Sequence, residues 1–408
     1  MAIEEGYFVS IGGGKNQLPL IQACRQLGLK VITIDKNQEA PGFKYSEFKI
    51  IESTHEYRKI YSLLSRIPLH EPIIAVGCRS YGKASLSAAY ISEKLNLPGL
   101  SYKLAKDFLD KKKIKEKLKG TGIKLPRSYS LKSRDGSFSL NSVRFPCIIK
   151  PRAGSGKKGV VIVRNKKELK EYVQVFMTDI DSFIVEDYIS GKEVTVMGFC
   201  SEKQFHLIAV IDKYTTTYSP FLEISHRLPS SFPLMIGELK YQTALMALRL
   251  GMKFCPVVAE FRINSRNEAY LIEIVPEVGG EYLAEYLLKE HEDYDYFQDY
   301  VRLMLGKKIK SRNLAELYKL SSIQTQLCFL APDKPGKYEY ISSEKIDVTK
   351  DEKLFLDTEL QEKGSIIETS NGNQARFRVI GLKSNAKLNA DDLDKTIRER
   401  AKLEYRKL

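Results

Sequence analysis

The sequence predicts a mixed fold of α/β and α+β units, in which an N-terminal doubly wound domain is followed by further domains. Residues 7–35 alternate strand, glycine-rich turn, helix and strand, which is the pattern of a βαβ unit. Residues 145–165 give an apolar strand, a loop rich in glycine and lysine, and a second strand. Residues 255–275 give two apolar runs around the polar segment SRNE, as expected for a β-hairpin. With 408 residues, the chain has room for roughly two to four domains.

The N-terminal α/β domain is expected to cover residues 1–102. Its GGG run connects the first strand to the first helix, and Asp35 ends the second strand. A further buried strand is expected at 72–77, followed by a helix. The glycines lack the full GxGxxG spacing because Gln17 occupies the last position, so we interpret them as a tight turn.

The rest of the chain alternates helical and strand-like segments. A charged helical region is expected at 103–125, a helix at 234–252, short strands between 320 and 382, and a basic helix at 390–406. Three further domains are predicted: 103–190 with the glycine loop, 191–320 with the hairpin, and 321–408 at the C-terminus.

Composition narrows the class of protein. The formal net charge of +14 and the pI near 9.2 suggest a polyanionic ligand, and a nucleoside triphosphate fits. No nucleic-acid motif is present, so no dedicated nucleic-acid site is expected. The chain has no apolar run long enough for a membrane span and no signal-peptide pattern, and its six scattered cysteines form no CxxC pair. We therefore expect reduced thiols, no zinc site and a cytoplasmic location.

Two acids interrupt the apolar strands of the predicted hairpin. If Asn264 and Ala269 oppose each other beside the turn, then Glu260 lies directly opposite Glu273. Their Cβ atoms would be roughly 5 Å apart. Carboxylates that close share either a proton or a cation. Because Arg262 is the only obvious base on the same face, a divalent metal is favoured; the alternative is a polar hairpin whose acids reach solvent.

The loop KPRAGSGKKGV has the composition of a phosphate-binding flap. Its glycines let backbone N–H groups approach phosphate oxygens, and its lysines add positive charge. The loop lies between two strands and is not a Walker A motif; the alternative is an ordinary surface hairpin. The next segment, FIVEDYISGKE, could offer backbone groups to an adenine edge and an acid to a ribose, or form a plain hairpin with exposed acids.

The order of these motifs resembles the ATP-grasp superfamily, and within it the carboxylate–amine ligases such as L-amino acid ligases. The resemblance covers nearly the whole chain. It implies a pre-ATP-grasp domain at the N-terminus, then an ATP-grasp fold with C-terminal strands. It also implies ATP and Mg²⁺, with Mn²⁺ as an alternative, small-molecule carboxylate and amine substrates, and a homodimer as one form of assembly.

The resemblance also assigns roles to individual residues. The implied nucleotide-binding residues are Lys111, Lys150, Ser155, Gly156, Lys157, Lys158, Glu186, Tyr188, Ile189 and Glu193. Lys111 and Lys150 would contact phosphates, the glycine loop would cover them, and the segment 186–189 would hold adenine. Glu193 would bind the ribose. Glu260 and Glu273 would be the paired magnesium ligands.

A second group of residues is implied to act on the substrates. Lys213, Glu223 and His226 precede Pro229 with the spacing of amino-acid ligases. Their implied roles are substrate positioning and, for Glu223 or His226, acceptance of a proton from the attacking amine.

The chain departs from the family pattern after Glu273. Val275 stands where a second metal ligand is usual, and Glu277 stands where an arginine usually stabilises an anionic carboxylate or acyl phosphate. Three explanations are open for Glu277. The substrate is cationic at this point; another base such as Arg262 or Lys213 substitutes; or catalysis is impaired.

The resulting functional expectation is ATP-dependent ligation of a carboxylate to an amine through an acyl phosphate, with a basic amino acid as one candidate substrate. The alternatives are an ATP-grasp carboxylase or phosphotransferase, and a catalytically impaired nucleotide-binding protein.

Overall fold

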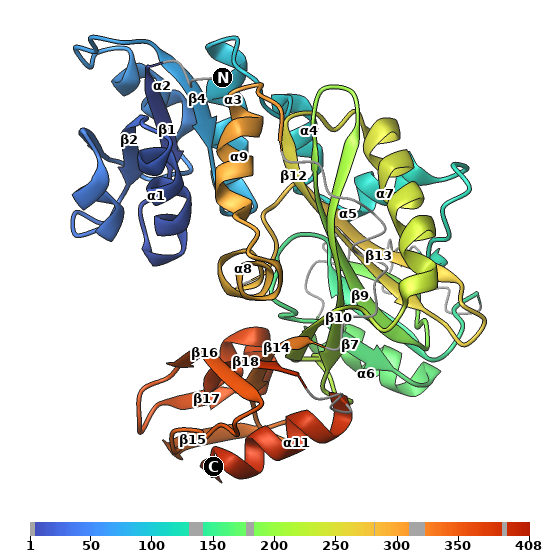
Figure 1. Cartoon of the computed structure of the whole chain (residues 1–408). Helices are drawn as coiled ribbons and strands as arrows, with labels where there is room; N and C mark the ends of the chain where they lie inside the picture. Colours follow the sequence, from blue (N-terminus) through green and yellow to red (C-terminus); the bar gives the residue numbers. More distant parts are fainter. Residues whose placement is uncertain (1–4, 130–141, 177–182, 281, 310–322, 386–389) are drawn as a thin grey trace.

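The computed structural model describes residues 5–129, 142–176, 183–280, 282–309, 323–385 and 390–408 (Figure 1). Four sheets organise this part of the chain. An N-terminal parallel sheet is followed by a small antiparallel sheet, an eight-stranded sheet through the centre, and a three-stranded sheet near the C-terminus. The mixed α/β and α+β architecture expected from the sequence is confirmed.

The N-terminal domain is a parallel sheet with helices on both faces. Its strands, in the order β3-β2-β1-β4, are β1 (Tyr7–Ile11), β2 (Lys30–Asp35), β3 (Phe48–Ile51) and β4 (Ile73–Gly77). Its helices are α1 (Leu18–Gln26), α2 (Tyr57–Leu64) and α3 (Lys83–Lys94). Phe8 packs in one core cluster with α1, whereas Val9 packs in another with α2 and α3. Since neighbouring residues of a strand point to opposite faces, both faces of the sheet are covered.

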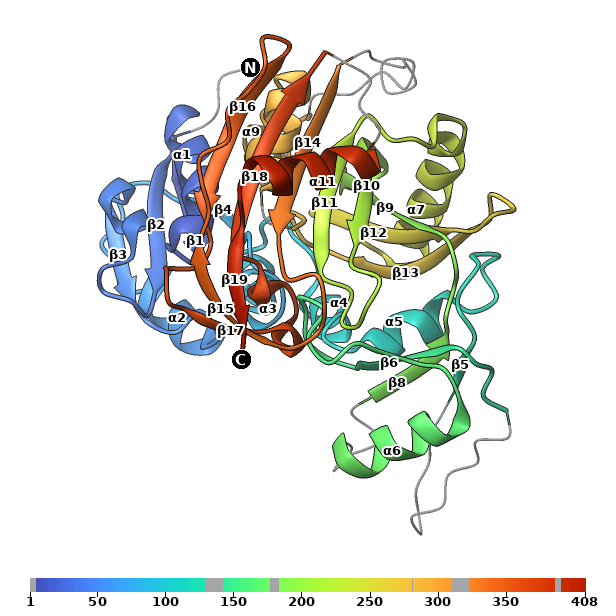
Figure 2. The same cartoon turned by 90° about the horizontal axis from the view of Figure 1, so that it is seen from below.

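The small antiparallel sheet carries the glycine loop. Its strands, in the order β5-β8-β6-β7, are β5 (Ser128–Tyr129), β6 (Cys147–Pro151), β7 (Val161–Val163) and β8 (Phe183–Asp187). The preceding charged region forms two helices, α4 (Tyr102–Asp107) and α5 (Lys111–Leu118), and α6 (Lys166–Phe176) follows β7. Figure 2 shows this unit projecting from the body of the molecule, with α6 at its far end. The predicted flap between two paired strands is confirmed.

The central sheet joins the middle of the chain to its C-terminal strands. Its order is β13-β12-β9-β10-β11-β14-β18-β16. The strands are β9 (Lys192–Cys200), β10 (Phe205–Thr215), β11 (Glu223–Leu228), β12 (Cys255–Ile263), β13 (Ala269–Val275), β14 (Gln324–Leu330), β16 (Glu352–Glu359) and β18 (Arg378–Ser384). The long helix α7 (Ile236–Leu250) packs on β9 and β10. Because β8 and β9 belong to different sheets, the glycine between them separates two units and does not close a hairpin.

The hairpin β12–β13 pairs Glu260 with Glu273, as predicted, but by a different route. Beside the turn the partner of Ala269 is Ile263 and not Asn264, so the predicted register is wrong by one residue there. A β-bulge after Glu260 then inserts one extra residue on β13 and restores the expected pairing.

The remaining elements complete the C-terminal part. They are η5 (Leu283–Leu287), α8 (Leu288–Glu292), α9 (Tyr296–Met304), β15 (Lys337–Ser342), β17 (Ile366–Glu368), η6 (Thr369–Ala375), α11 (Ala390–Arg400) and β19 (Glu404–Lys407). The basic helix predicted for 390–406 therefore ends at Arg400. Its last predicted residues instead form β19, which pairs with β15. The domain boundary predicted at 320 lies outside the described residues.

Two observations bear on the environment of the protein. All six cysteines are buried, and none of them forms a disulfide. Among the described residues, no helix is long and apolar enough to cross a membrane.

Candidate active site

A cavity of about 950 Å³ lies where the units of the chain meet. Arg79 from the N-terminal domain, Lys150 from the small sheet, Glu260 from the central sheet and Arg376 from the C-terminal strands all line it. The structure brings fifteen of the sixteen predicted site residues to the cavity wall. The exception is Lys213, which is buried directly behind the wall and pairs with its acids.

Each acid of the predicted metal pair has its own lysine. Lys213 Nζ lies 2.6 Å from Glu260 Oε1, and Lys111 Nζ lies 2.7 Å from Glu273 Oε1. The expectation that only Arg262 could reach this pair is therefore wrong: Arg262 turns away and pairs with Glu193 at 3.0 Å. The sequence does not predict these partners, because Lys213 lies on β10, two strands from β12, and Lys111 belongs to a different unit.

The two acids still suit a hard divalent cation. Their side chains face the cavity, and magnesium prefers carboxylate oxygens combined with phosphate oxygens. No cluster of three or more metal-binding side chains occurs in the described part of the chain, so a nucleotide would have to complete the coordination. Burial disfavours ionisation of Glu273, but Lys111, together with Lys150 and Lys157, outweighs burial and holds its pKa below the ordinary value. Val275 points into the core, pairs with Val258 and supplies no ligand.

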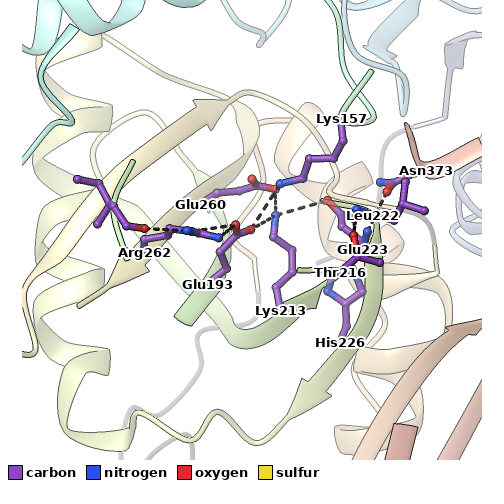
Figure 3. A network of polar contacts seen from close by, with 11 residues as sticks. Lys157, Glu193, Lys213, Thr216, Leu222, Glu223, His226, Glu260, Arg262 and Asn373 are labelled. Atoms are coloured by element: carbon purple, nitrogen blue, oxygen red, sulfur yellow. Dashed lines mark hydrogen bonds and ion pairs between the residues drawn. The ribbon is translucent and has the colours of Figure 1, made fainter. Parts of the chain in front are cut away.

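Lys213 is the centre of a buried charge network (Figure 3). Its Nζ lies 2.6 Å from Glu260, 3.3 Å from Glu193 and 3.5 Å from Glu223. Burial opposes its charge, but these three acids raise its pKa well above the ordinary value. Lys213 therefore stays protonated and acts as a fixed positive charge rather than as a base.

Glu223 and His226 lie together on β11. Glu223 Oε2 is 3.5 Å from His226 Nε2, and the ring of His226 packs edge-on against Phe329. Burial opposes ionisation of Glu223, but Lys213 and His226 lower its pKa far below the ordinary value. His226 Nδ1 is buried and has no hydrogen-bond partner among the described residues. The lowered pKa makes Glu223 a weak proton acceptor, so the imidazole is the remaining candidate base of this pair.

Glu186 forms a buried ion-pair cluster with two lysines. Lys150 Nζ lies 2.9 Å from its carboxylate, and Lys115 binds the other oxygen. Burial lowers the pKa of Lys115 to about 8, whereas the two lysines overcome burial and lower that of Glu186 to about 2. The predicted adenine role can therefore involve only the backbone at Glu186. Lys115 was missed because nothing in the sequence distinguishes it from the other lysines of the same charged helix.

Arg262 closes the other side of the expected adenine site. Its guanidinium lies 4.9 Å from the ring centroid of Tyr188 and donates to the carbonyl of Ile189 at 2.7 Å. Tyr188 also stacks on Phe221, which belongs to the β10–β11 connection. An aromatic and cationic wall of this kind suits the flat face of a nucleobase.

The glycine loop lies against the cavity and is held at several points. Lys111 Nζ donates to the carbonyl of Gly154 at 2.6 Å, and Lys157 Nζ lies 3.5 Å from Glu193. Gly154 and Gly156 have φ angles of +111° and +69°, which side chains rarely adopt. The predicted ribose acid Glu193 is thus shared among Lys157, Lys213 and Arg262.

Glu277 is the least compensated acid at the cavity. It makes no hydrogen bond and no ion pair with any residue that the structure describes. Burial and the nearby charges of Glu273 and Glu260 raise its pKa to about 8. The bases suggested as substitutes for the missing arginine, Arg262 and Lys213, are both committed to Glu193.

Several cavity residues had no signal in the sequence. Arg79 binds Glu285, Tyr81 donates to the carbonyl of Phe108, and Arg376 lies over the ring of Phe329 at 4.0 Å. They come from loops far from the recognised motifs. The turn sequence SNGNQA before Arg376 marks an irregular segment, but no local pattern places that segment at the site.

Comparison with known proteins agrees with this geometry. A family model described as an ATP-grasp domain matches residues 143–285. The chain contains an ATP-grasp domain. The matched segment includes the glycine loop, the Lys213 network and both strands of the acid hairpin.

The ATP-grasp chain also has relatives over most of its length. It is 25% identical to an N5-carboxyaminoimidazole ribonucleotide synthase of Staphylococcus aureus over 323 residues, which are 76% of this chain and 79% of the relative. It is 24% identical to 269 residues of the carbamoyl phosphate synthase large chain of Helicobacter pylori, covering 62% of this chain and 24% of that protein.

Solved structures show the same fold. The L-amino acid ligase of Bacillus licheniformis superposes with a TM-score of 0.76 at 18% identity over all of both chains. The phosphoribosylglycinamide synthetase of Anaerococcus prevotii superposes with a TM-score of 0.70 at 19% identity, covering 98% of this chain and 100% of that one. The ATP-grasp fold thus extends across the whole chain, including the N-terminal domain and the C-terminal strands.

Proposed function

We propose that this ATP-grasp protein is an ATP-dependent carboxylate–amine ligase. The observation that carries the proposal is that one cavity unites a lysine-bearing glycine flap, a facing pair of acids and a buried lysine–acid–histidine group. The first two suit a metal-bound triphosphate, and the third suits deprotonation of an attacking amine. The similar proteins named above are synthases, a synthetase and a ligase, which supports the same class.

The flap and lysines would hold ATP. Lys111, Lys150 and Lys157 would contact its phosphates, and the wall formed by Tyr188 and Arg262 would receive the base. Magnesium on Glu260 and Glu273 would neutralise phosphate charge. Lys111 pairs with Glu273 in this structure, so its movement onto a phosphate would leave that carboxylate available to the metal.

The proposed reaction has two steps. A substrate carboxylate attacks the γ-phosphorus, an O–P bond forms, and ADP leaves, giving an acyl phosphate. The amine nitrogen then attacks the acyl carbon, a C–N bond forms, and inorganic phosphate leaves. His226 accepts the proton of the amine while Glu223 orients the imidazole. Lys213 stabilises the negative charge that develops nearby.

Glu277 suggests the nature of one substrate. An unpaired acid at the cavity favours a ligand that brings a cation, because such a ligand would relieve the repulsion from Glu273 and Glu260. Of the three explanations for this residue, a cationic substrate is therefore the one we propose, and a basic amino acid is the simplest candidate.

The test is release of ADP from Mg²⁺–ATP in the presence of paired amino acids, including lysine, ornithine and arginine. ADP and inorganic phosphate formed only with a particular pair would establish ligation. ADP formed with bicarbonate alone would indicate a carboxylase and contradict the proposal. ATP binding without turnover in any mixture would support a non-catalytic nucleotide-binding protein and contradict the proposal.

Location and assembly belong to the same proposal. Six buried cysteines that form no disulfide agree with a reducing compartment, and we propose the cytoplasm. The expected homodimer remains a prediction, and light scattering coupled to gel filtration would test it.

A further inference from the structure

The C-terminal segment Thr369–Ala375 reaches across the cavity to the glycine flap. The backbone N–H of Asn373 donates to the carbonyl of Gly156 at 3.0 Å. This is a contact between two loops that belong to different sheets, and both of them line the cavity. None of the motifs recognised in the sequence includes this segment.

Gly372 permits the close approach of the two loops. A Cβ atom at this position would lie 2.1 Å from the carbonyl oxygen of Gly156 and 2.9 Å from the backbone nitrogen of Lys158. Both neighbours are backbone atoms, which cannot move aside as a flexible side chain can. Gly372 also has φ +66° and ψ −142°, a conformation that residues with a side chain rarely adopt.

Asn373 also binds the strand that carries the candidate catalytic pair. Its Oδ1 accepts a hydrogen bond from the backbone N–H of Glu223 at 3.0 Å (Figure 3). Its own carbonyl accepts from Arg376 Nε at 2.7 Å, and Arg376 lies over Phe329. One residue thus connects the flap to β11 and to the packed core of the central sheet.

This contact differs from the lysine side-chain contacts of the flap. Lys111 and Lys157 hold the flap through side chains that the proposed nucleotide site would use for phosphates. The bond from Asn373 to Gly156 joins two backbone groups and uses no lysine side chain. A bound nucleotide that attracts the lysines therefore does not compete with this bond. It can therefore persist when the lysines change partners.

We propose that Gly372 and Asn373 form a latch that holds the flap closed and couples its position to Glu223. Asn373 is a positioning residue in this scheme. The latch rests on the proposed function only for the identity of the ligand beneath the flap. Flap closure itself can be measured without any activity, so the two proposals can fail separately.

The experiment is limited trypsin digestion of the full-length protein, with cleavage after Lys157 and Lys158 followed by mass spectrometry. Gly372→Ala should accelerate this cleavage about tenfold, because proteolysis follows the population of the open loop and a backbone hydrogen bond is lost. Gly364→Ala is the matched control, since Gly364 also has a positive φ, +81°, but nothing lies near its missing side chain. Thermal unfolding of both variants would show whether the overall fold is intact.

A second pair of variants tests the coupling to β11. Asn373→Ala keeps the backbone donor to Gly156 but removes the acceptor for Glu223, and flap cleavage should still rise several-fold. Asn373→Asp keeps an acceptor and should restore slow cleavage. Ser370→Ala, on the exposed side of the same segment, should behave as wild type.

Two results would overturn the latch. One is a Gly372→Ala protein that is folded and cleaved at the flap at the wild-type rate. The other is equal acceleration by Gly364→Ala, which would point to general strain. Equal cleavage of Asn373→Ala and wild type would disprove the coupling to Glu223. If the latch holds and no substrate pair releases ADP, only the proposed reaction fails.

Discussion

Glu277 shows at the residue scale how the surroundings decide the properties of a side chain. A glutamate at the surface would be ionised at neutral pH, but here burial and two neighbouring acids favour the protonated form. The raised pKa therefore follows from a local excess of negative charge. A cation, whether a metal on Glu260 and Glu273 or a positively charged substrate, would remove that excess.

The pH dependence of stability should reveal this acid. In the unfolded chain its pKa is 4.5, and in the folded protein it is about 8. The folded state then binds the extra proton between these values, so Glu277 lowers the free energy of unfolding as the pH rises from 4.5 to 8. The free energy of unfolding of Glu277→Gln should therefore exceed that of wild type by an amount that grows across this pH range. The difference should be on the order of a few kcal/mol at pH 8.

Denaturant unfolding at pH 5 and pH 8.5 in metal-free buffer is the measurement for this variant. A difference between Glu277→Gln and wild type that stays constant with pH would contradict the assignment.

Charge reversal at the same position tests the choice of substrate. Glu277→Arg should impair use of a basic partner at least tenfold in kcat/KM, because it replaces an attraction by a repulsion, and it should favour a neutral or acidic partner. The assay is ADP release with matched basic and neutral amino acids. An unchanged preference between basic and neutral amino acids would contradict the proposal of a cationic substrate.

The metal assignment is tested on the hairpin. Glu273→Gln should lower turnover by a hundredfold or more while the fold is kept, since a neutral amide is a poor magnesium ligand. Glu268→Gln, on the same hairpin but in a surface pair with Lys124, is the control and should remain active. A fully active Glu273→Gln enzyme would refute the assignment.

Adjacent strands build the charge network at the element scale. Arg262 on β12, Glu193 on β9 and Lys213 on β10 stand opposite one another across three strands, so charges alternate along one row of the sheet. Lys213 also reaches Glu260, which lies two residues from Arg262 along β12. The network depends on strand register as well as on strand order, because a shift of one residue would move a whole strand's side chains to the other face.

Removal of the central lysine should show how much the network depends on it. Lys213→Met leaves three acids without their shared cation and should cost about 3–5 kcal/mol of stability. If Mg²⁺ binds Glu260 and Glu273 as proposed, millimolar Mg²⁺ should restore part of the loss. Thermal unfolding with and without Mg²⁺ measures both effects. A variant as stable as wild type would show that Lys213 is dispensable to the fold.

The N-terminal domain is tied to the rest of the chain at the scale of the whole molecule. One core cluster contains residues of α1 and β1 together with residues of α9 and the central sheet. In Figure 1, α9 stands between the N-terminal sheet and β12. The hydroxyl of Tyr300 on α9 donates to the carbonyl of Cys78 at 2.9 Å and accepts from its N–H at 3.1 Å. This interface holds Arg79 and Tyr81 at the cavity.

Tyr300→Phe tests that interface. The change leaves a buried N–H and a buried carbonyl without partners, which should cost on the order of 1–3 kcal/mol. Unfolding should then begin at the N-terminal domain, and calorimetry should resolve two transitions where wild type shows more overlap. Tyr241→Phe, at an exposed position on α7, is the control. Equal stability of the two variants would disprove the role of Tyr300.

The sequence by itself determined most of the elements and predicted most of the candidate site, for a physical reason that is local. Apolar periodicity indicates strands and helices, a GxG-type loop with lysines indicates a flap, and acids such as Glu260 and Glu273 stand out in apolar runs. The pairing of these two acids was predicted from counting along the hairpin, although a bulge that the sequence does not reveal was needed to produce it.

Only the tertiary structure decided which charges meet. Lys213, Lys111 and Lys115 reach their acids from other strands and other units, and strand order is a long-range property that periodicity does not contain. The latch at Gly372 and Asn373 is of the same kind, because its turn-like sequence says nothing about the flap that it contacts. Local patterns therefore determine the parts of this protein, and long-range packing decides the ionisation and closure of its site.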